Sequence, residues 1–226
     1  MCINKELSLS ALIISWSIGF YLLYRNEDTD RWNAIFIMTF SLMQLIDFIL
    51  WWLYDTGNFN HPANYYISKY IVSFVLVCEL VAVYLGSQLY KNSNKYSGFW
   101  NRVKLDFINS LYPKILLCVV VWMLWFNIKY NNKTVIGNDG GLIWGDNINK
   151  KGILKYVCGI IFIIFLLYPY LEYIWVNPVI TIIIIYLIIT LTYSFIIGTH
   201  WGSYWCWIAN FLSIIVLCIP VILKYV

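Results

Sequence analysis

The chain has 226 residues, of which 62% are apolar and only 12% charged, and its formal net charge is +4. A soluble domain is about 45–50% apolar and about 25% charged, so the composition excludes an ordinary soluble domain, a disordered tail and a disulfide-stapled mini-protein. A chain of 26.7 kDa has too little interior for so much apolar surface, and its mean hydropathy of +0.72 predicts an integral membrane protein.

Seven stretches are long and apolar enough to cross a hydrocarbon core of about 30 Å. The last two share Tyr173 to Leu223, which holds no formally charged residue and is too long for one span. The sequence therefore predicts an all-α, seven-transmembrane helix bundle in a single domain, residues 1–226, although a count of six or eight also fits. The predicted spans are residues 7–24, 32–54, 66–90, 112–127, 154–171, 178–197 and 203–223.

Two connections are long enough to hold structure of their own. Lys91 to Leu111 predicts a short amphipathic helix lying in the membrane interface. Lys129 to Lys155 contains Asn138-Asp139-Gly140-Gly141 between two short apolar runs, which predicts a β-hairpin in an extramembrane loop, capping one mouth of the bundle. The apolar face of the interfacial helix is predicted to hold Phe99, Trp100, Val103, Phe107, Ile108 and Leu111.

The distribution of basic residues sets the orientation only weakly. A small majority lies in the cytoplasmic loops if the N-terminus is outside or lumenal. This topology places the sequon Asn132-Lys133-Thr134 outside, so Asn132 is a candidate glycosylation site. No basic run with interleaved aromatic residues is present, so we expect no nucleic-acid partner.

Two acids near the middle of predicted spans, Asp47 and Glu79, are the first candidates for a functional site. An ionised carboxylate at the bilayer centre costs roughly 2.5–3.5 kcal/mol, so neither acid should face lipid. Gln44 shares a helix face with Asp47, and Glu79 shares one with Gly86, a small residue that lets another helix approach. We interpret these residues as a polar core that binds a proton, a cation or a polar ligand. Packing by two protonated, hydrogen-bonded acids is the alternative.

A second polar stripe lies along the last predicted span. Ser203, Cys206, Asn210 and Ser213 recur at helical spacing, and His200 stands at the entrance among tryptophans. A ligand mouth is one interpretation, and an interfacial aromatic belt with small polar helix contacts is the one that the composition favours. No metal-ligand spacing, nucleophile–base pair or cofactor fingerprint is present, so we expect no metal, no cofactor and no enzymatic activity.

Two motifs resemble a known family. Residues 41–51, SLMQLIDFILW, combine Met-Gln, an acid three residues after the glutamine, and a tryptophan, and residues 202–207 read GSYWCW. Both are similar to elements of uncharacterised polytopic membrane proteins of giant DNA viruses and some protists, which share a domain of unknown function. Asp47 stands where that family usually has Glu. The resemblance implies a multi-pass protein of a host-cell or virion membrane and supplies no activity.

The leading functional hypothesis is a small transporter or channel in which Asp47 and Glu79 bind or relay a proton or a cation. A heptahelical ligand-binding or sensor-like protein, opsin-shaped but without a retinal lysine, is the second hypothesis. A viral membrane scaffold or remodelling protein is the third. The lipid bilayer is the expected partner, and homo-oligomerisation stays open.

Overall fold

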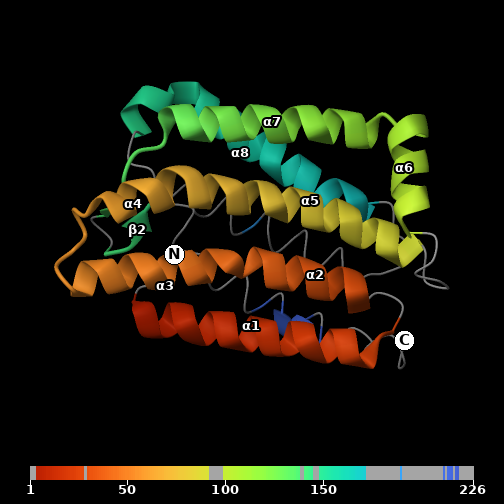
Figure 1. Ribbon diagram of the computed structural model, residues 1–226, viewed down its shortest axis with the longest axis horizontal. Helices are drawn as coiled ribbons and strands as arrows, with labels where there is room; N and C mark the ends of the chain where they lie inside the picture. Colours follow the sequence, from red (N-terminus) through yellow and green to blue (C-terminus); the bar gives the residue numbers. More distant parts are fainter. Residues whose placement is uncertain are drawn as a thin grey trace.

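The computed structural model describes residues 4–27, 30–91, 99–137, 140–144 and 148–171, with residues 189, 211, 213–215, 217 and 218 beyond them. This part of the chain is mostly helical and contains one short β-hairpin (Figure 1). The elements are α1 (Lys5–Arg25), α2 (Asp30–Phe40), α3 (Leu42–Asp55), α4 (Pro62–Tyr66), the π-helical turn η1 (Ile67–Ile71), α5 (Val72–Lys91), α6 (Phe99–Asn109), α7 (Tyr112–Tyr130), β1 (Val135–Ile136), β2 (Leu142–Ile143) and α8 (Ile148–Leu171).

Four helical stretches in the described part are long and apolar enough to cross a membrane: Lys5–Arg25, Asp30–Asp55, Pro62–Leu89 and Tyr112–Tyr130. They coincide with the first four predicted spans, which confirms an all-α fold whose long helices are compatible with membrane insertion. The second stretch is two helices, α2 and α3, that meet at Ser41. The fifth predicted span falls in α8, a helix of 24 residues that contains the apolar stretch Val157–Pro169. The predicted spans 178–197 and 203–223 lie outside the described residues, apart from single positions.

A tight turn with an ion pair joins α1 to α2. Asn26 ends α1 in the left-handed conformation, with φ of 58°, and its N–H donates to the Leu22 carbonyl at 2.9 Å. The Arg25 guanidinium then donates to both carboxylate oxygens of Asp30, at 2.8 and 2.7 Å. Because Arg25 ends α1 and Asp30 begins α2, each charge also lies at the helix end that favours it. Asp30 is 1% exposed, so this pairing is what makes its burial tolerable.

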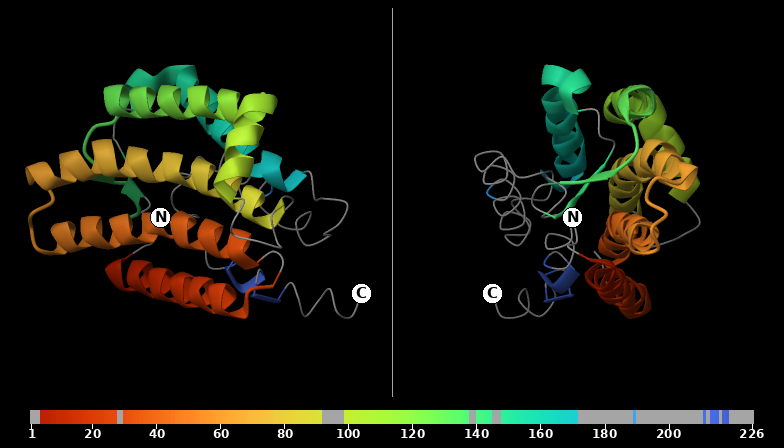
Figure 2. Two further views of the ribbon diagram at one scale, coloured as in Figure 1. Left: turned by 45° about the vertical axis from the view of Figure 1, so that its right-hand side comes forward. Right: turned by 90° about the vertical axis from the view of Figure 1, so that its left-hand side faces the viewer.

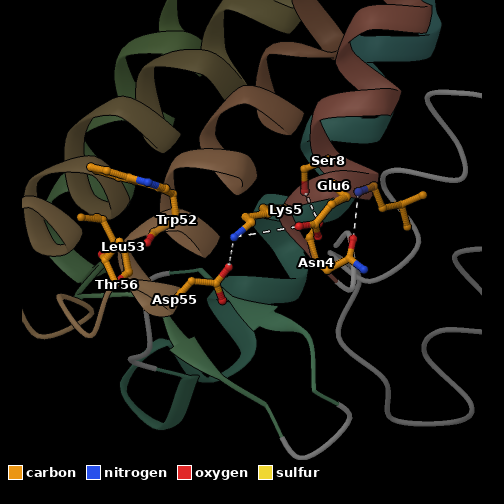
Figure 3. A network of polar contacts seen from close by, with 9 residues as sticks. Asn4, Lys5, Glu6, Ser8, Trp52, Leu53, Asp55 and Thr56 are labelled. Atoms are coloured by element: carbon orange, nitrogen blue, oxygen red, sulfur yellow. Dashed lines mark hydrogen bonds and ion pairs between the residues drawn. The ribbon is translucent and has the colours of Figure 1, made fainter.

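The opposite end of α1 is joined to α3 by surface contacts (Figure 3). The Asn4 side chain caps α1 by accepting from the Leu7 N–H at 2.8 Å. Lys5 then donates to Asp55, the last residue of α3, at 2.6 Å. Because Lys5 and Asp55 remain solvent-accessible, we expect their ion pair to align the helix ends and to add little stability.

The long helices pack side by side in one order across the molecule. α1 lies against α2 and α3, these lie against α5, and α5 in turn contacts α7 and α8 (Figures 1 and 2). The central helices α2, α3 and α5 supply most of the buried core. The outer helices expose apolar side chains along their lengths, such as Ile13 and Phe20 on α1, Val121 on α7, and Ile160 and Ile164 on α8. Exposed apolar surface of this extent is typical of a membrane or partner interface.

Helix α6 crosses one end of the bundle, at a steep angle to α5 and α7 (Figure 1). Its Asp106 accepts hydrogen bonds from Tyr84 at 2.8 Å and Gln88 at 3.2 Å, which fix the helix to the end of α5. Phe107 and Ile108 are exposed, as the predicted interfacial face requires, and Leu105 is exposed beside them. The prediction of a short amphipathic helix in this connection is therefore confirmed, while the side chains of Phe99 and Trp100 lie outside the described residues.

Two glycines set the distance between neighbouring helices. A Cβ at Gly86 of α5 would overlap the Trp32 indole ring of α2, so only glycine fits there. A Cβ at Gly19 of α1 would lie 2.5 Å from Cγ of Met38. The predicted close approach of a helix to the face of α5 that carries Gly86 is thereby confirmed. The two contacts differ because an indole ring is rigid, whereas a methionine side chain can rotate away.

The paired substitutions Gly86→Ala and Gly19→Ala test this difference. We expect Gly86→Ala to lower the free energy of unfolding by about 1–3 kcal/mol, the usual effect of overpacking a core. Gly19→Ala should be nearly neutral, because movement of Met38 relieves the overlap and alanine favours a helix by about 1 kcal/mol over glycine. Denaturant unfolding in detergent micelles measures both. Equal losses of stability in the two variants would show that the ring contact does not limit helix approach.

Candidate functional site

Six buried polar side chains lie on α3 and on the continuous stretch from α4 to α5. We call them the polar track, and none is more than 1% exposed. Gln44 and Asp47 lie one turn apart on α3, as predicted, and Glu79 lies on α5. The sequence analysis predicted these three as site residues. It did not predict the other three, because they show no distinctive spacing among their apolar and aromatic neighbours. The polar track consists of Gln44, Asp47, Asn64, Ser68, Ser73 and Glu79.

The members of the polar track lie at successive depths from one end of the bundle. The two helical stretches run antiparallel, since Trp32 near the start of α2 contacts Gly86 near the end of α5. At 1.5 Å per residue, Asp47 is about 12 Å from Asp55 at the end of α3. Glu79 is about 25 Å from Pro62 and about 15 Å from Leu89, the two ends of its span. Asn64 therefore lies near the end, Asp47 deeper, and Glu79 near the middle of its span.

The hairpin after α7 reaches Asp47. The register pairs Val135 with Ile143 and Ile136 with Leu142, which confirms the predicted hairpin. Leu142 has no exposed surface and packs in the core cluster of α3 and α5, so the hairpin docks against these helices, and its place outside the membrane stays a prediction. In the ribbon views the hairpin lies along one side of α3 and α4 (Figures 1 and 2). Directly after β2, the Trp144 indole N–H donates to Oδ1 of Asp47 at 2.9 Å.

Asn64 joins the hairpin to the start of the third span, because both the nitrogen and the oxygen of its side-chain amide are hydrogen-bonded. Its Nδ2 donates to the carbonyls of Phe59 at 2.9 Å and Thr134 at 3.0 Å. Its Oδ1 accepts from the Thr134 N–H and the Ser68 hydroxyl, both at 2.9 Å. The hydroxyls of Ser68 and Thr134 lie 2.6 Å apart. Thr134 is fully buried here, so the third residue of the sequon has a structural role, while Asn132 is exposed.

The π-helical turn η1 lies beside this network. A π-turn shifts the backbone hydrogen bonding by one residue and is frequent at functional sites. Here the Ser68 carbonyl accepts from the Asn131 side chain at 3.5 Å, and Asn131 also donates to the Ser73 hydroxyl at 3.4 Å. Asn131, which follows α7, is thus bonded to one residue within η1 and to one just after it. The irregular turn of the third span and the segment leading into the hairpin are held together.

Glu79 and Gln44 differ from the rest of the polar track. Both oxygens of the Glu79 carboxyl group are buried without a hydrogen-bond partner among the described residues. The same holds for the amide nitrogen and oxygen of Gln44. Leaving a buried polar group unsatisfied costs about 1–3 kcal/mol, and more for a charged group, so proteins rarely retain one without a use. Both predicted acids are buried, but only Asp47 has a hydrogen bond from the hairpin.

The other predicted site residues divide into two groups. His200, Ser203, Cys206 and Asn210 lie outside the described residues. Ser213, one helical step beyond Asn210 in the same stripe, is buried and donates to the Ser15 hydroxyl of α1 at 3.1 Å. This contact is the small polar helix contact expected of the stripe. Trp144, Asn64 and Thr134 were missed, because nothing in the local sequence indicates that the hairpin docks between helices.

The substitution Asn64→Asp tests the network at the hairpin. It preserves shape but replaces the donor Nδ2 by an oxygen, so the Phe59 and Thr134 carbonyls lose their donor. We expect a loss of about 1–3 kcal/mol for each carbonyl left unsatisfied, measured by unfolding in micelles. Asn132→Asp is the matched control at an exposed position, and we expect a change within about 0.5 kcal/mol. Equal stability of the two variants would refute the structural role of Asn64.

Comparison with known proteins assigns the chain to no family. The chain matches no protein-family model, no curated protein and no solved structure. Within the described part of the chain, no group of three or more His, Cys, Asp or Glu side chains is arranged to hold a metal ion. The chemistry of the polar track is therefore the basis on which a function can be inferred.

Proposed function

We propose that the chain is a multi-pass membrane protein of seven transmembrane helices and that its polar track binds and passes a proton or a small cation. Four long apolar helices with exposed apolar outer faces support a bilayer setting. The amphipathic α6 across one end supports it too, since such helices lie at the interface. At the other end the ammonium of Lys69 lies 4.9 Å from the Tyr65 ring centroid, and that of Lys129 lies 4.6 Å from the Trp125 ring centroid. Lysine and aromatic side chains are typical of the headgroup level.

The observation that carries the proposal is the unsatisfied burial of Glu79. A carboxyl group in the middle of a transmembrane helix is expensive and is retained mainly in ion pathways and proton relays. Both oxygens of Glu79 lack a partner among the described residues, so both are available to a proton or a cation. A guest that supplies positive charge or a donor would remove the cost of burying this group.

Gln44 supplies the complementary chemistry. Its amide oxygen is an acceptor for a cation or a donor, and its amide nitrogen is a donor for a carboxylate or a water molecule. The hydroxyl and amide groups of Ser68, Ser73 and Asn64 continue the polar track toward the hairpin end. Within the polar track, the buried oxygen and nitrogen atoms of Gln44 and Glu79 are the ones without a partner among the described residues, and they are suited to bind water or an ion where lipid would not.

A small polar ligand is the second candidate guest, and Gln44 is the observation that favours it. A ligand carrying both a donor and an acceptor would satisfy the amide of Gln44, whose nitrogen and oxygen are both buried without a partner among the described residues. The protein would then be a heptahelical receptor or sensor, not a transporter. Transport of the guest across the bilayer separates the two functions, since a receptor binds without flux.

The sequon at Asn132 supports an orientation of the chain in the membrane, and the two motifs that resemble a known family support a kind of membrane. We propose that the N-terminus and the hairpin end lie outside or in a lumen, where the exposed Asn132 would be open to glycosylation. The resemblance of SLMQLIDFILW and GSYWCW to viral and protist polytopic proteins supports a host-cell or virion membrane.

The variant Glu79→Gln tests the proposed function. Glutamine keeps the size of the side chain but cannot exchange a proton or carry negative charge, so we expect flux to fall to the level of protein-free liposomes. Purified protein in liposomes that contain a pH-sensitive dye, under an imposed proton or sodium gradient, provides the measurement. Glu6→Gln, at the exposed start of α1, is the matched control and should transport as the unmodified chain does. Undiminished flux through Glu79→Gln would remove Glu79 from the pathway.

A further inference from the structure

We propose that the segment between α7 and α8 is a plug that closes the hairpin end of the polar track, and that the hydrogen bond from Trp144 to Asp47 holds it in place. The plug segment comprises residues 131–137 and 140–144. On this assignment Asp47 is a positioning residue for the plug, and Glu79 with Gln44 is the site that binds the guest. The inference rests on the proposed function and concerns the regulation of the same site.

The plug segment is seated between the helices by its own buried side chains. Leu142 has no exposed surface and packs in the cluster that contains Ile46 and Leu50 of α3 and Val72 of α5. Thr134 has none either and is enclosed by the network around Asn64. The plug segment therefore contacts both α3 and the start of the third span, and its Trp144 reaches the depth of Asp47.

The hydrogen bond from Trp144 to Asp47 involves a carboxylate, whereas the hydrogen bonds around Asn64 join uncharged groups. Trp144 is only partly buried, but its indole N–H reaches a carboxylate that is 1% exposed. A hydrogen bond to a carboxylate is among the stronger single contacts in proteins. The Trp144 N–H therefore offsets part of the cost of burying the Asp47 carboxylate. This separates its role from that of Glu79, whose oxygens lack any such donor in the described structure.

The hairpin is too small to be ordered on its own. Each strand has two residues, and an isolated two-stranded hairpin is marginally stable at best in water. Its seated conformation therefore depends on a few contacts with the helices, chiefly those of Leu142, Thr134 and Trp144. A segment held by few contacts leaves its seat when one of them is lost, whereas the packed helices do not.

The position of the plug segment also determines which residues of the polar track a guest can reach from the hairpin end. Gln44 lies one turn deeper than Asp47 on α3, and Glu79 lies deeper still on α5. A guest that enters from the hairpin end meets the plug before it meets either of them. Release of Trp144 from Asp47 should thus raise access to Glu79 without changing the residues that bind the guest.

The experiment uses a reporter cysteine, Leu142→Cys, in a chain whose six native cysteines are replaced by alanine or serine. In nanodiscs a charged, membrane-impermeant thiol reagent labels this position only when the plug leaves its seat. We expect Trp144→Phe, which keeps the ring and loses the donor, to raise the labelling rate on the order of tenfold. Asp47→Leu should do the same. Asp47→Asn keeps an acceptor oxygen in place and should label within about twofold of the parent.

A reversible lock gives a second, independent measurement. The Ser68 and Thr134 hydroxyl oxygens are 2.6 Å apart, so cysteines at both positions are close enough for a disulfide. In liposomes, flux through the Ser68→Cys/Thr134→Cys chain should be lower after oxidation than under a reductant, and the comparison is made within this one variant because Ser68 belongs to the polar track. This arm keeps Trp144 in place, so it decides the question even if Trp144→Phe fails to fold.

The outcomes separate the plug from the proposed function. Unchanged labelling in both folded variants, Trp144→Phe and Asp47→Leu, overturns the plug, and so does flux that is indifferent to the lock. If Glu79→Gln abolishes flux while the lock has no effect, the plug fails and the proposed function stands. If no form of the chain shows flux, the proposed function fails, and the labelling rates of Leu142→Cys still decide whether Trp144 holds the plug.

Discussion

Burial of polar groups away from water is the constraint on which the rest of the structure depends. In an apolar bundle each such group must find its partner within the protein or bind one from outside. Near the helix ends the requirement is met by short, specific bonds: Arg25 with Asp30, Asn64 with Thr134, and Asp106 with Tyr84 and Gln88. These bonds connect neighbouring elements, and so they shape the fold while they satisfy buried atoms.

Toward the middle of the spans the requirement is met unevenly. Asp47 has the Trp144 indole as a donor, whereas Glu79 and Gln44 have none among the described residues. The two acids are alike in burial and in position within a span, but they differ in what surrounds them. This difference is the physical basis for dividing them into a residue that holds the plug and a residue that binds the guest.

Close packing and irregular backbone make room for this arrangement. Gly86 lets α2 approach α5 until the Trp32 ring touches the backbone, which fixes the distance between the central helices. The π-helical turn η1 presents the Ser68 carbonyl to the Asn131 side chain, so the loop after α7 is anchored where the hairpin enters. An apolar contact at one end of α5 and a polar one at the other therefore align the same helix.

Composition and hydropathy by themselves determined that the chain is helical, that its first four long helices are compatible with a membrane, and that Asp47 and Glu79 face inward. The local turn residues also predicted the hairpin, because turn preference and alternation depend on near neighbours, whereas the structure supplied its register. Only the tertiary structure decided where the hairpin goes and which acid it satisfies. Trp144 and Asp47 are 97 residues apart, and no local pattern encodes a partner at that distance. Such pairings arise when packed helices leave one space that a particular loop fills.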